Sequence, residues 1–113
     1  MQEFIFLFRG GKTTDASEER LEKHEQDWET WMDQLDENGV LIDGLPMKDH
    51  AVIIDQHGKT ARDLSADDSV TGYLILEAED MDAAVEMADG CPIFDFGGSV
   101  EVRGLDAHRG DED

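Results

Sequence analysis

The chain has 113 residues and a net charge of −20, with 29 acidic residues against 9 basic ones. A chain of this length forms one domain with a modest core. So acidic a surface repels phosphate backbones and anionic lipids, which argues against nucleic-acid and membrane binding. The acidity is either that of an ordinary solvated surface or an adaptation to a salty cytoplasm, where cations screen the repulsion.

The cellular compartment is indicated by what the sequence lacks. A single cysteine, Cys91, cannot form a disulfide within the chain, which favours a reducing compartment. The first nine residues lack the basic segment that opens a signal peptide, and no apolar stretch is long enough to span a membrane. We therefore expect a cytoplasmic protein.

Residues 2–9 are predicted to form the first strand. Its three phenylalanines share one face, whereas Ile5 and Leu7 share the other. Because both faces are apolar, both have to be covered in the folded protein. Gly10 and Gly11 end this strand.

Residues 17–38 are predicted to form a long helix. Asp15 or Ser17 would cap its first turn, and Gly39 would supply the left-handed residue that follows its last turn. One stripe of this helix is largely apolar, and the rest of its surface is almost wholly charged. The stripe consists of Leu21, His24, Trp28, Trp31, Met32 and Leu35.

The middle of the chain contains short strands separated by turns. We expect strands at residues 40–43 and 51–55, followed by a hairpin turn at 56–59. Residues 59–64 would return as a short edge strand, and residues 65–69 would form a loop.

Residues 70–77 form the clearest central strand, because they are apolar on both faces, with Tyr73 and Ile75 on one of them. Asp80 would cap a second helix at residues 81–89. The predicted apolar face of this helix consists of Met81, Ala84, Val85 and Ala88.

The end of the chain closes the domain. Pro92 suits the first position of a short helical turn, and Gly97 with Gly98 leads into a last strand at residues 99–105. This strand alternates apolar and charged residues, so we expect it to have one covered face and to lie at an edge of the sheet. Residues 106–113 would form an acidic polar tail.

The predicted order is β-α-β, a β-hairpin, then β-α-β. This order is the ferredoxin-like plait, an α+β fold with an antiparallel sheet and two helices on one face. Residues 1–105 would form it as a single domain. The two helices cover one face only, although the first and central strands are apolar on both faces. A homodimer with its two sheets face to face would cover the second face.

Several stretches of the chain carry the pattern of a known family. They are Glu3 to Gly11, Trp28, Trp31 and Leu35, Gly39 to Leu41, Gly72 with Tyr73, Ala84 to Ala88, Gly90 to Pro92, and, most specifically, Gly97 to Arg103. In these residues the chain resembles the YCII-related family, also called the DGPF-type branch of the dimeric α/β barrel proteins. The resemblance covers about residues 1–105. It implies a ferredoxin-like fold and a homodimer built as a barrel.

The resemblance transfers no catalytic residue. The Asp-Gly-Pro-Phe signature that names the branch is absent from residues 62–70. The branch also has a helix histidine, proposed to act with an aspartate, but the corresponding position here is Trp28, and His24 lies one turn earlier. The family has no settled activity, and some relatives are linked to sigma factors. A regulatory accessory protein is therefore implied as an alternative to an enzyme.

His24 has two interpretations. It lies on the helix stripe one turn before Trp28, so it could simply pack against the indole. Alternatively, it could serve as a general base or ligand contact in a pocket under the helix, with Asp43 as an orienting carboxylate.

The other candidates have similar alternatives. Trp28 and Trp31 could anchor the core or the dimer interface, or line an apolar ligand pocket. Tyr73 has the same two possibilities, and Arg9 could hold an anionic ligand or pair with one of the many acidic residues. The ligand-pocket candidates are Arg9, His24, Trp28, Trp31, Asp43 and Tyr73.

No metal, cofactor or nucleophile is expected. His50 and His57, each beside or near an aspartate, match no zinc spacing. Cys91 is interpreted as a small structural residue. Gly97 and Gly98 precede a strand rather than a helix, so they do not form a phosphate loop.

Two functional hypotheses follow. In the first, the protein is a homodimeric small-molecule-binding or enzyme-like protein with a cleft near the first helix. In the second, it is a non-enzymatic accessory module that acts through protein contacts. The sequence identifies neither a ligand nor a reaction.

Overall fold

The computed structural model describes residues 1–11, 13, 16–63 and 69–106 of the chain. Its elements are β1 (Gln2–Arg9), α1 (Glu18–Glu37), β2 (Leu41–Pro46), β3 (His50–Asp55), β4 (Gly58–Asp63), β5 (Val70–Ala78), α2 (Met81–Asp89), the 3₁₀ helix η1 (Pro92–Phe96) and β6 (Ser99–Gly104). The predicted loop at 65–69 and tail at 106–113 lie almost wholly outside the described residues.

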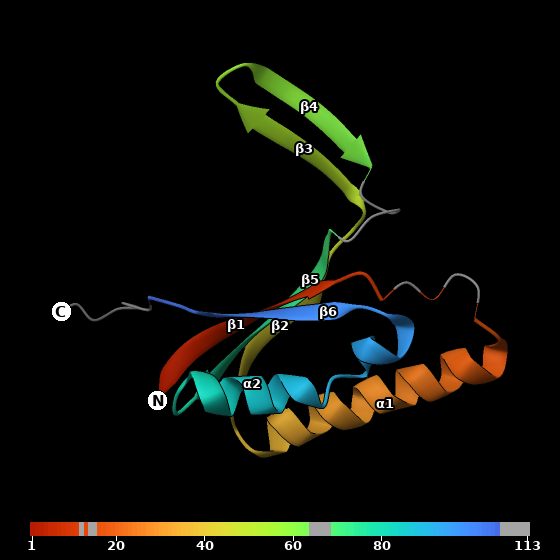
Figure 1. The fold of residues 1–113 in the computed structure, drawn as a ribbon, viewed down its shortest axis with the longest axis vertical. Helices are drawn as coiled ribbons and strands as arrows, with labels where there is room; N and C mark the ends of the chain where they lie inside the picture. The colour runs from red at the N-terminus through yellow and green to blue at the C-terminus, as the bar shows by residue number, and fades with distance from the viewer. Residues whose placement is uncertain (12, 14–15, 64–68, 107–113) are drawn as a thin grey trace.

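The main sheet has four strands in the order β2-β5-β1-β6, and every neighbouring pair is antiparallel. Both helices lie on one face of this sheet (Figure 1). Each helix connects two parallel strands that have a third strand between them, which is the split β-α-β arrangement. The predicted α+β ferredoxin-like plait is therefore confirmed.

The core lies between this sheet and the helices. In the pairing of β1 with β5, Phe4 lies opposite Leu76 and Phe6 opposite Leu74, all on the helix side. The side chains of Phe4, Phe6 and Leu76 are 2%, 0% and 0% exposed. Burial of side chains of this size contributes roughly 1.5–3 kcal/mol each to folding.

Helix α1 follows the predicted pattern at both ends and along its stripe. The Ser17 hydroxyl accepts a hydrogen bond from the Arg20 amide at 3.2 Å, and Gly39 has a φ of +72°. Trp31 is buried, stacks on Phe6 with ring centroids 6.4 Å apart, and donates a 3.1 Å hydrogen bond to the Met87 carbonyl oxygen. Trp31 therefore joins α1 to both the sheet and α2.

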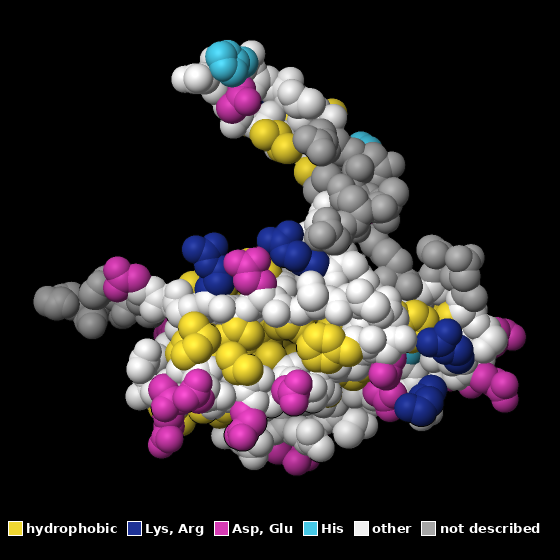
Figure 2. All heavy atoms as spheres, in the orientation of Figure 1, with side chains coloured by type: hydrophobic (Ala, Val, Ile, Leu, Met, Phe, Trp, Pro, Cys, Tyr) yellow, Lys and Arg dark blue, Asp and Glu magenta, His cyan; other side chains and the backbone are white. Residues whose placement is uncertain are grey.

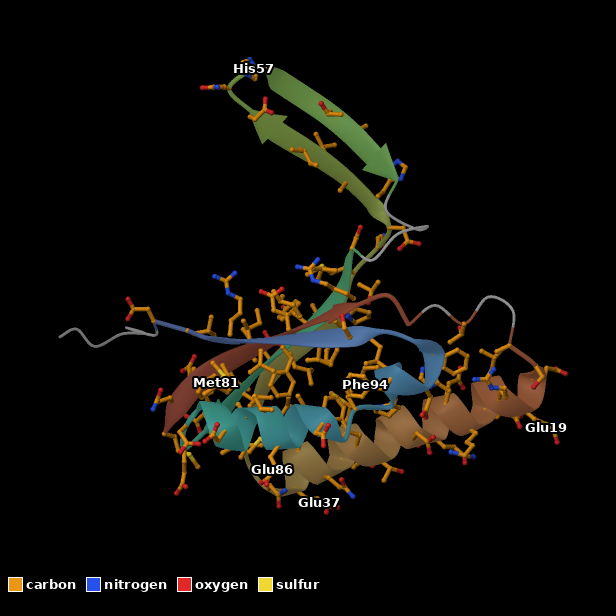
Figure 3. The ribbon with its side chains drawn as sticks, viewed as in Figure 1. Glu19, Glu37, His57, Met81, Glu86 and Phe94 are labelled. Atoms are coloured by element: carbon orange, nitrogen blue, oxygen red, sulfur yellow. The ribbon has the colours of Figure 1, made fainter. Side chains whose placement is uncertain are left out.

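Helix α2 has the predicted length and cap, but its predicted apolar face is partly wrong. Ala84 and Ala88 are buried as expected, whereas Met81 and Val85 are 43% and 48% exposed. Instead of Met81 and Val85, the partly buried residues of α2 that pack against the core are Ala83 and Met87. Two alanines let the helix approach the sheet closely, and this moves the larger Met81 and Val85 to the outer flank. Figure 3 shows Met81 at the start of α2.

The closing segment also follows the prediction. Pro92 begins η1, and Gly97, at a φ of +75°, ends it in the left-handed conformation. Strand β6 then pairs only with β1 among the described strands, so it forms an edge of the main sheet. Val102 lies opposite Phe6 on the helix side, while Glu101 lies opposite Leu7 on the other side.

The β3–β4 hairpin, hereafter the arm (residues 50–63), departs from the expectation of a single sheet. It forms a separate two-stranded sheet and does not extend the main one. Figure 1 shows it projecting from the main sheet on the side opposite the helices. The edge position that it would have taken beside β2 stays open, because the chain turns away after Pro46.

The face of the main sheet opposite the helices has an apolar centre. Its central side chains are Ile5, Leu7, Tyr73 and Ile75, and Leu45 at its margin is 62% exposed. No described helix or strand covers them, and we call this surface the open face. None of the helices in the described part of the chain is long and apolar enough to cross a membrane.

Candidate functional site

A pocket of about 330 Å³ lies between α1 and one end of the main sheet. It is at the end where β1 and β2 stop and β5 starts, beside the foot of the arm. Its lining residues are Phe8, Gly10, Gly11, His24, Trp28, Met32, Gly44, Leu45, Pro46, Thr71, Gly72, Tyr73, Leu74 and Ile93. Most of these contribute apolar side chains or bare backbone, so the pocket favours an apolar ligand.

Two glycines make this end of the sheet possible. A Cβ added to Gly11, whose φ is +71°, would lie 2.5 Å from the Ile93 side chain. A Cβ added to Gly44 would collide with Leu74 and lie 2.7 Å from the Tyr73 carbonyl oxygen. The pocket wall therefore depends on backbone that no larger residue could replace without a shift.

His24 is the polar group of the pocket with the most informative contacts. The Trp28 indole N–H donates to His24 Nε2 at 2.9 Å, across one turn of α1. An indole can only donate, so Nε2 must be the unprotonated nitrogen. Neutral His24 therefore carries its proton on Nδ1, a tautomer inferred from this hydrogen bond.

The Nδ1 atom of His24 is buried and has no hydrogen-bond partner among the described residues. A buried N–H without a partner costs about 1–3 kcal/mol, so an acceptor is expected beside it. Since His24 is part of the pocket lining, a bound molecule could provide that acceptor. This is the most specific chemical feature of the pocket.

Aromatic rings hold the His24 imidazole in place. Phe96 of η1 packs on it with ring centroids 4.3 Å apart, and Phe8 meets Trp28 edge to face at 5.3 Å. The Arg20 guanidinium lies over the Phe96 ring, 4.5 Å from its centroid. With neighbours on both sides, the imidazole has a fixed orientation, which is what a specific contact to a ligand requires.

The structure brings three of the six candidate residues together and places the others elsewhere. His24, Trp28 and Tyr73 line the pocket, although the strand position of Tyr73 places its side chain on the open face, whereas Trp31 packs in the core. The Asp43 carboxylate accepts a 2.8 Å hydrogen bond from the Gly44 amide, and its strand position is opposite Ile75 on the open face. Asp43 therefore does not orient His24.

Arg9, the sixth candidate, forms an ion pair rather than part of the pocket wall. Its guanidinium lies 3.1 Å from the Glu101 carboxylate on β6, and both side chains are more than a third exposed. Pairing with an acidic residue was one of its two predicted uses. The partner is 92 positions away in sequence, so only the strand pairing of β1 with β6 reveals it.

Several pocket residues were not identified from sequence. Phe8 and Met32 belong to predicted apolar faces, which on their own indicate only burial. Gly44, Thr71 and Ile93 come from three separate segments, and no sequence spacing relates them. Thr71 donates a 3.2 Å hydrogen bond to the Phe8 carbonyl oxygen, so its hydroxyl proton is already used.

Cys91 has the character of a buried structural residue. It is 3% exposed, and burial raises the pKa of its thiol to about 12, partly offset by a backbone hydrogen bond at Ile93. At neutral pH the sulfur is therefore protonated and a poor nucleophile. Across the described residues, no group of three or more His, Cys, Asp or Glu side chains is arranged to hold a metal ion.

Comparison with known families supports the fold and assigns the family. The model of the YCII-related domain matches residues 6–105, which is most of the chain. The chain belongs to the YCII-related family. A search of curated proteins returned no match for this YCII-related chain.

A solved structure with the same fold is 5-chloro-2-hydroxyhydroquinone dehydrochlorinase (TftG) from Burkholderia phenoliruptrix AC1100, in complex with 2,5-dihydroxybenzoquinone. The similarity covers 91% of each chain, with a TM-score of 0.53 and 16% sequence identity. At this identity the similarity establishes the fold of the YCII-related chain.

Proposed function

We propose that this YCII-related protein binds a small ring-shaped molecule in the pocket beneath α1. The observation that carries the proposal is the buried Nδ1 of His24, a proton-bearing nitrogen without a partner among the described residues, on a side chain that lines the pocket. A ligand oxygen placed beside Nδ1 would accept this proton in a hydrogen bond. His24 would thereby fix the orientation of the ligand.

The size and chemistry of the lining support a flat, largely apolar ligand. A volume of about 330 Å³ is at the lower end of the range for small-molecule sites. Phe8, Trp28 and Leu74 provide apolar walls, and a substituted six-membered ring would make contact with them. The ligand class we propose is therefore an aromatic or quinonoid ring that carries at least one oxygen.

The dehydrochlorinase offers a practical choice of probe. Its structure was solved with 2,5-dihydroxybenzoquinone, a ring with oxygen substituents, so this compound and the uncharged hydroquinone are suitable test ligands. Measurements in about 0.5 M KCl would limit the repulsion between an anionic probe and a chain of net charge −20.

A pair of substitutions at His24 tests the proposal by titration calorimetry. His24→Gln can still accept from Trp28 but has no donor at the Nδ1 position, so we expect the probe affinity to fall about tenfold. His24→Asn keeps a donor near Nδ1 and should lose less. The matched control is Gln26→Asn, an exposed residue of α1 outside the pocket lining, which should bind as the wild type does.

Two results would contradict this proposal. One is the absence of measurable binding by either ring compound to the wild-type protein. The other is an unchanged affinity in His24→Gln, which would mean that Nδ1 does not contact the ligand. Circular dichroism spectra of both variants would verify that each is folded.

We also propose that the protein is a cytoplasmic homodimer in which two open faces pack together. The open face has an apolar centre, and no described helix or strand packs against it. It is also less acidic than the helix side, since Arg9 and Arg103 both pair with Glu101 on it. Two copies related by a two-fold axis would each cover the other's open face.

A further inference from the structure

We propose that the arm, residues 50–63, packs against a second copy of this chain and clasps it in the dimer. This inference rests on the proposed open-face dimer and adds a specific element to it. The arm would determine the strength of assembly, because each copy would hold its partner at the sheet and also along the arm.

The first argument is that the arm has no packing layer of its own. Apart from the pairing of β3 with β4, neither strand makes a substantial contact with another described element. A two-stranded hairpin alone is marginally stable in water, since it buries little apolar surface. A surface on another molecule would provide the missing layer.

The second argument is the sequence of β3. Val52 and Ile54 share one face of the ribbon and are 59% and 69% exposed, while Ile53 on the other face is 45% exposed. Consecutive exposed β-branched residues on an unprotected hairpin are typical of a binding surface. The space-filling view shows hydrophobic side chains along the arm (Figure 2).

The third argument is the position of the arm. It projects on the side of the main sheet opposite the helices, which is also the side of the open face (Figure 1). A molecule seated on the open face would therefore lie beside the arm. Six-residue strands extend about 20 Å, and packed sheets are about 10 Å apart, so the arm is long enough to lie along the edge of the partner's sheet.

Charge favours a second copy as the occupant. Residues 48–63 contain equal numbers of acidic and basic residues, although the chain as a whole has a net charge of −20. In contrast, α1 alone carries nine acidic residues and two basic ones. The arm can therefore approach another acidic copy of the chain with far less repulsion than two acidic helix surfaces would suffer.

Two acidic substitutions on the arm test the inference. Val52→Asp with Ile54→Asp places two charges where we propose apolar contacts, so we expect the dimer dissociation constant, measured by sedimentation equilibrium, to rise about tenfold or more. Val85→Asp with Met81→Asp is the matched control, since it adds the same charges at similarly exposed apolar positions on α2. This control should dimerise as the wild type does.

A second measurement identifies what the arm touches. A photo-crosslinking amino acid at position 54, in an equal mixture of ¹⁵N-labelled and unlabelled protein, should give crosslinked peptides that combine the two isotopes. Crosslinks confined to one chain would overturn the inference, because the arm would then fold back on its own body.

The outcomes separate the arm from the open-face dimer. If Ile75→Asp on the open face weakens the dimer but the arm variant does not, the arm inference fails and the open-face dimer stands. If the wild-type protein is a monomer at all accessible concentrations, both proposals fail. If dimerisation is weakened by both variants but not by the α2 control, both are supported.

Discussion

At the scale of single residues, the spacing of His24 and Trp28 on α1 determines the tautomer of the His24 imidazole. The two residues are one turn apart, and the Trp28 indole N–H donates a 2.9 Å hydrogen bond to Nε2 of the imidazole. The remaining proton is then confined to Nδ1, the atom without a partner. A hydrogen bond within α1 thus decides which atom of His24 can act in the pocket.

The shared stripe of His24 and Trp28 was predictable from sequence, because residues four apart lie on the same side of a helix. The lack of a partner at Nδ1 was not, since it depends on Phe96 and on residues of the sheet that pack around the ring. The hypothesis that Asp43 orients His24 was wrong for a related reason. Strand alternation decides which face Asp43 takes, and the pairing of β2 with β5 includes an irregularity beside it.

Cys91 allows a prediction about reactivity and pH. Because burial raises the pKa of its thiol to about 12, above the value of 9.0 for an exposed thiol, the folded protein holds this proton more tightly than the unfolded chain. Unfolding would therefore release the proton between these two values. The free energy of unfolding should fall as the pH rises through that window, by up to about 1.4 kcal/mol per pH unit.

The measurement is a set of urea titrations of wild type and Cys91→Ala between about pH 8 and about pH 10. Because the two proteins differ only at this side chain, the difference between their unfolding free energies isolates the contribution of the thiol. A constant difference across the range would contradict the assignment. The single cysteine should likewise resist iodoacetamide in the folded protein and react once urea unfolds it.

At the scale of elements, the predicted ends of the helices were right because the residues that cap them act locally. Asp80 accepts a 2.9 Å hydrogen bond from the Ala83 amide at the start of α2. The buried face of α2 was harder to predict, since four of its nine residues are alanine or valine with little to separate them. Tertiary packing determines that Ala84 and Ala88 are the buried residues of α2.

The cap of α2 provides a test of element stability. Asp80→Ala removes the hydrogen bond to Ala83, and we expect the free energy of unfolding to fall by about 1 kcal/mol in a urea titration. Asp82→Ala in the first turn is the matched control, because it removes the same charge and no capping bond. We expect a change of roughly half that size or less in the control. Equal losses would mean that charge, not capping, stabilises the helix start.

The arm shows where local patterns stop being informative. Its two strands and its turn were predicted, because a run of β-branched residues followed by a His-Gly turn is typical of a hairpin. Its separation from the main sheet was not predicted. Whether a hairpin joins a sheet or leaves it depends on the few residues after Pro46 and on what lies beside it in the assembled protein.

At the scale of the whole molecule, charge is unevenly distributed. Helices α1 and α2 carry twelve acidic residues between them, whereas the two strands of the arm carry two. Self-repulsion on the helix side opposes folding, and added salt screens it over distances of about 10 Å or less. The surface is therefore a determinant of stability as well as of solubility.

We expect the melting temperature to rise by about 5 °C or more between about 0.1 M and about 2 M KCl, as followed by circular dichroism. A variant with Glu22, Glu25 and Glu29 replaced by glutamine removes three exposed charges from α1 and should show a smaller rise. A melting temperature that does not change with salt would identify the acidity as that of an ordinary solvated surface.

One consequence follows from the strands that carry the arm. The same two strands, β2 and β5, form part of the pocket wall and continue into the arm at Pro46 and Val70. A partner that holds the arm would therefore also fix the rim of the pocket. Ligand affinity would then depend on protein concentration, and by thermodynamic reciprocity a bound ring would tighten the dimer by the same factor.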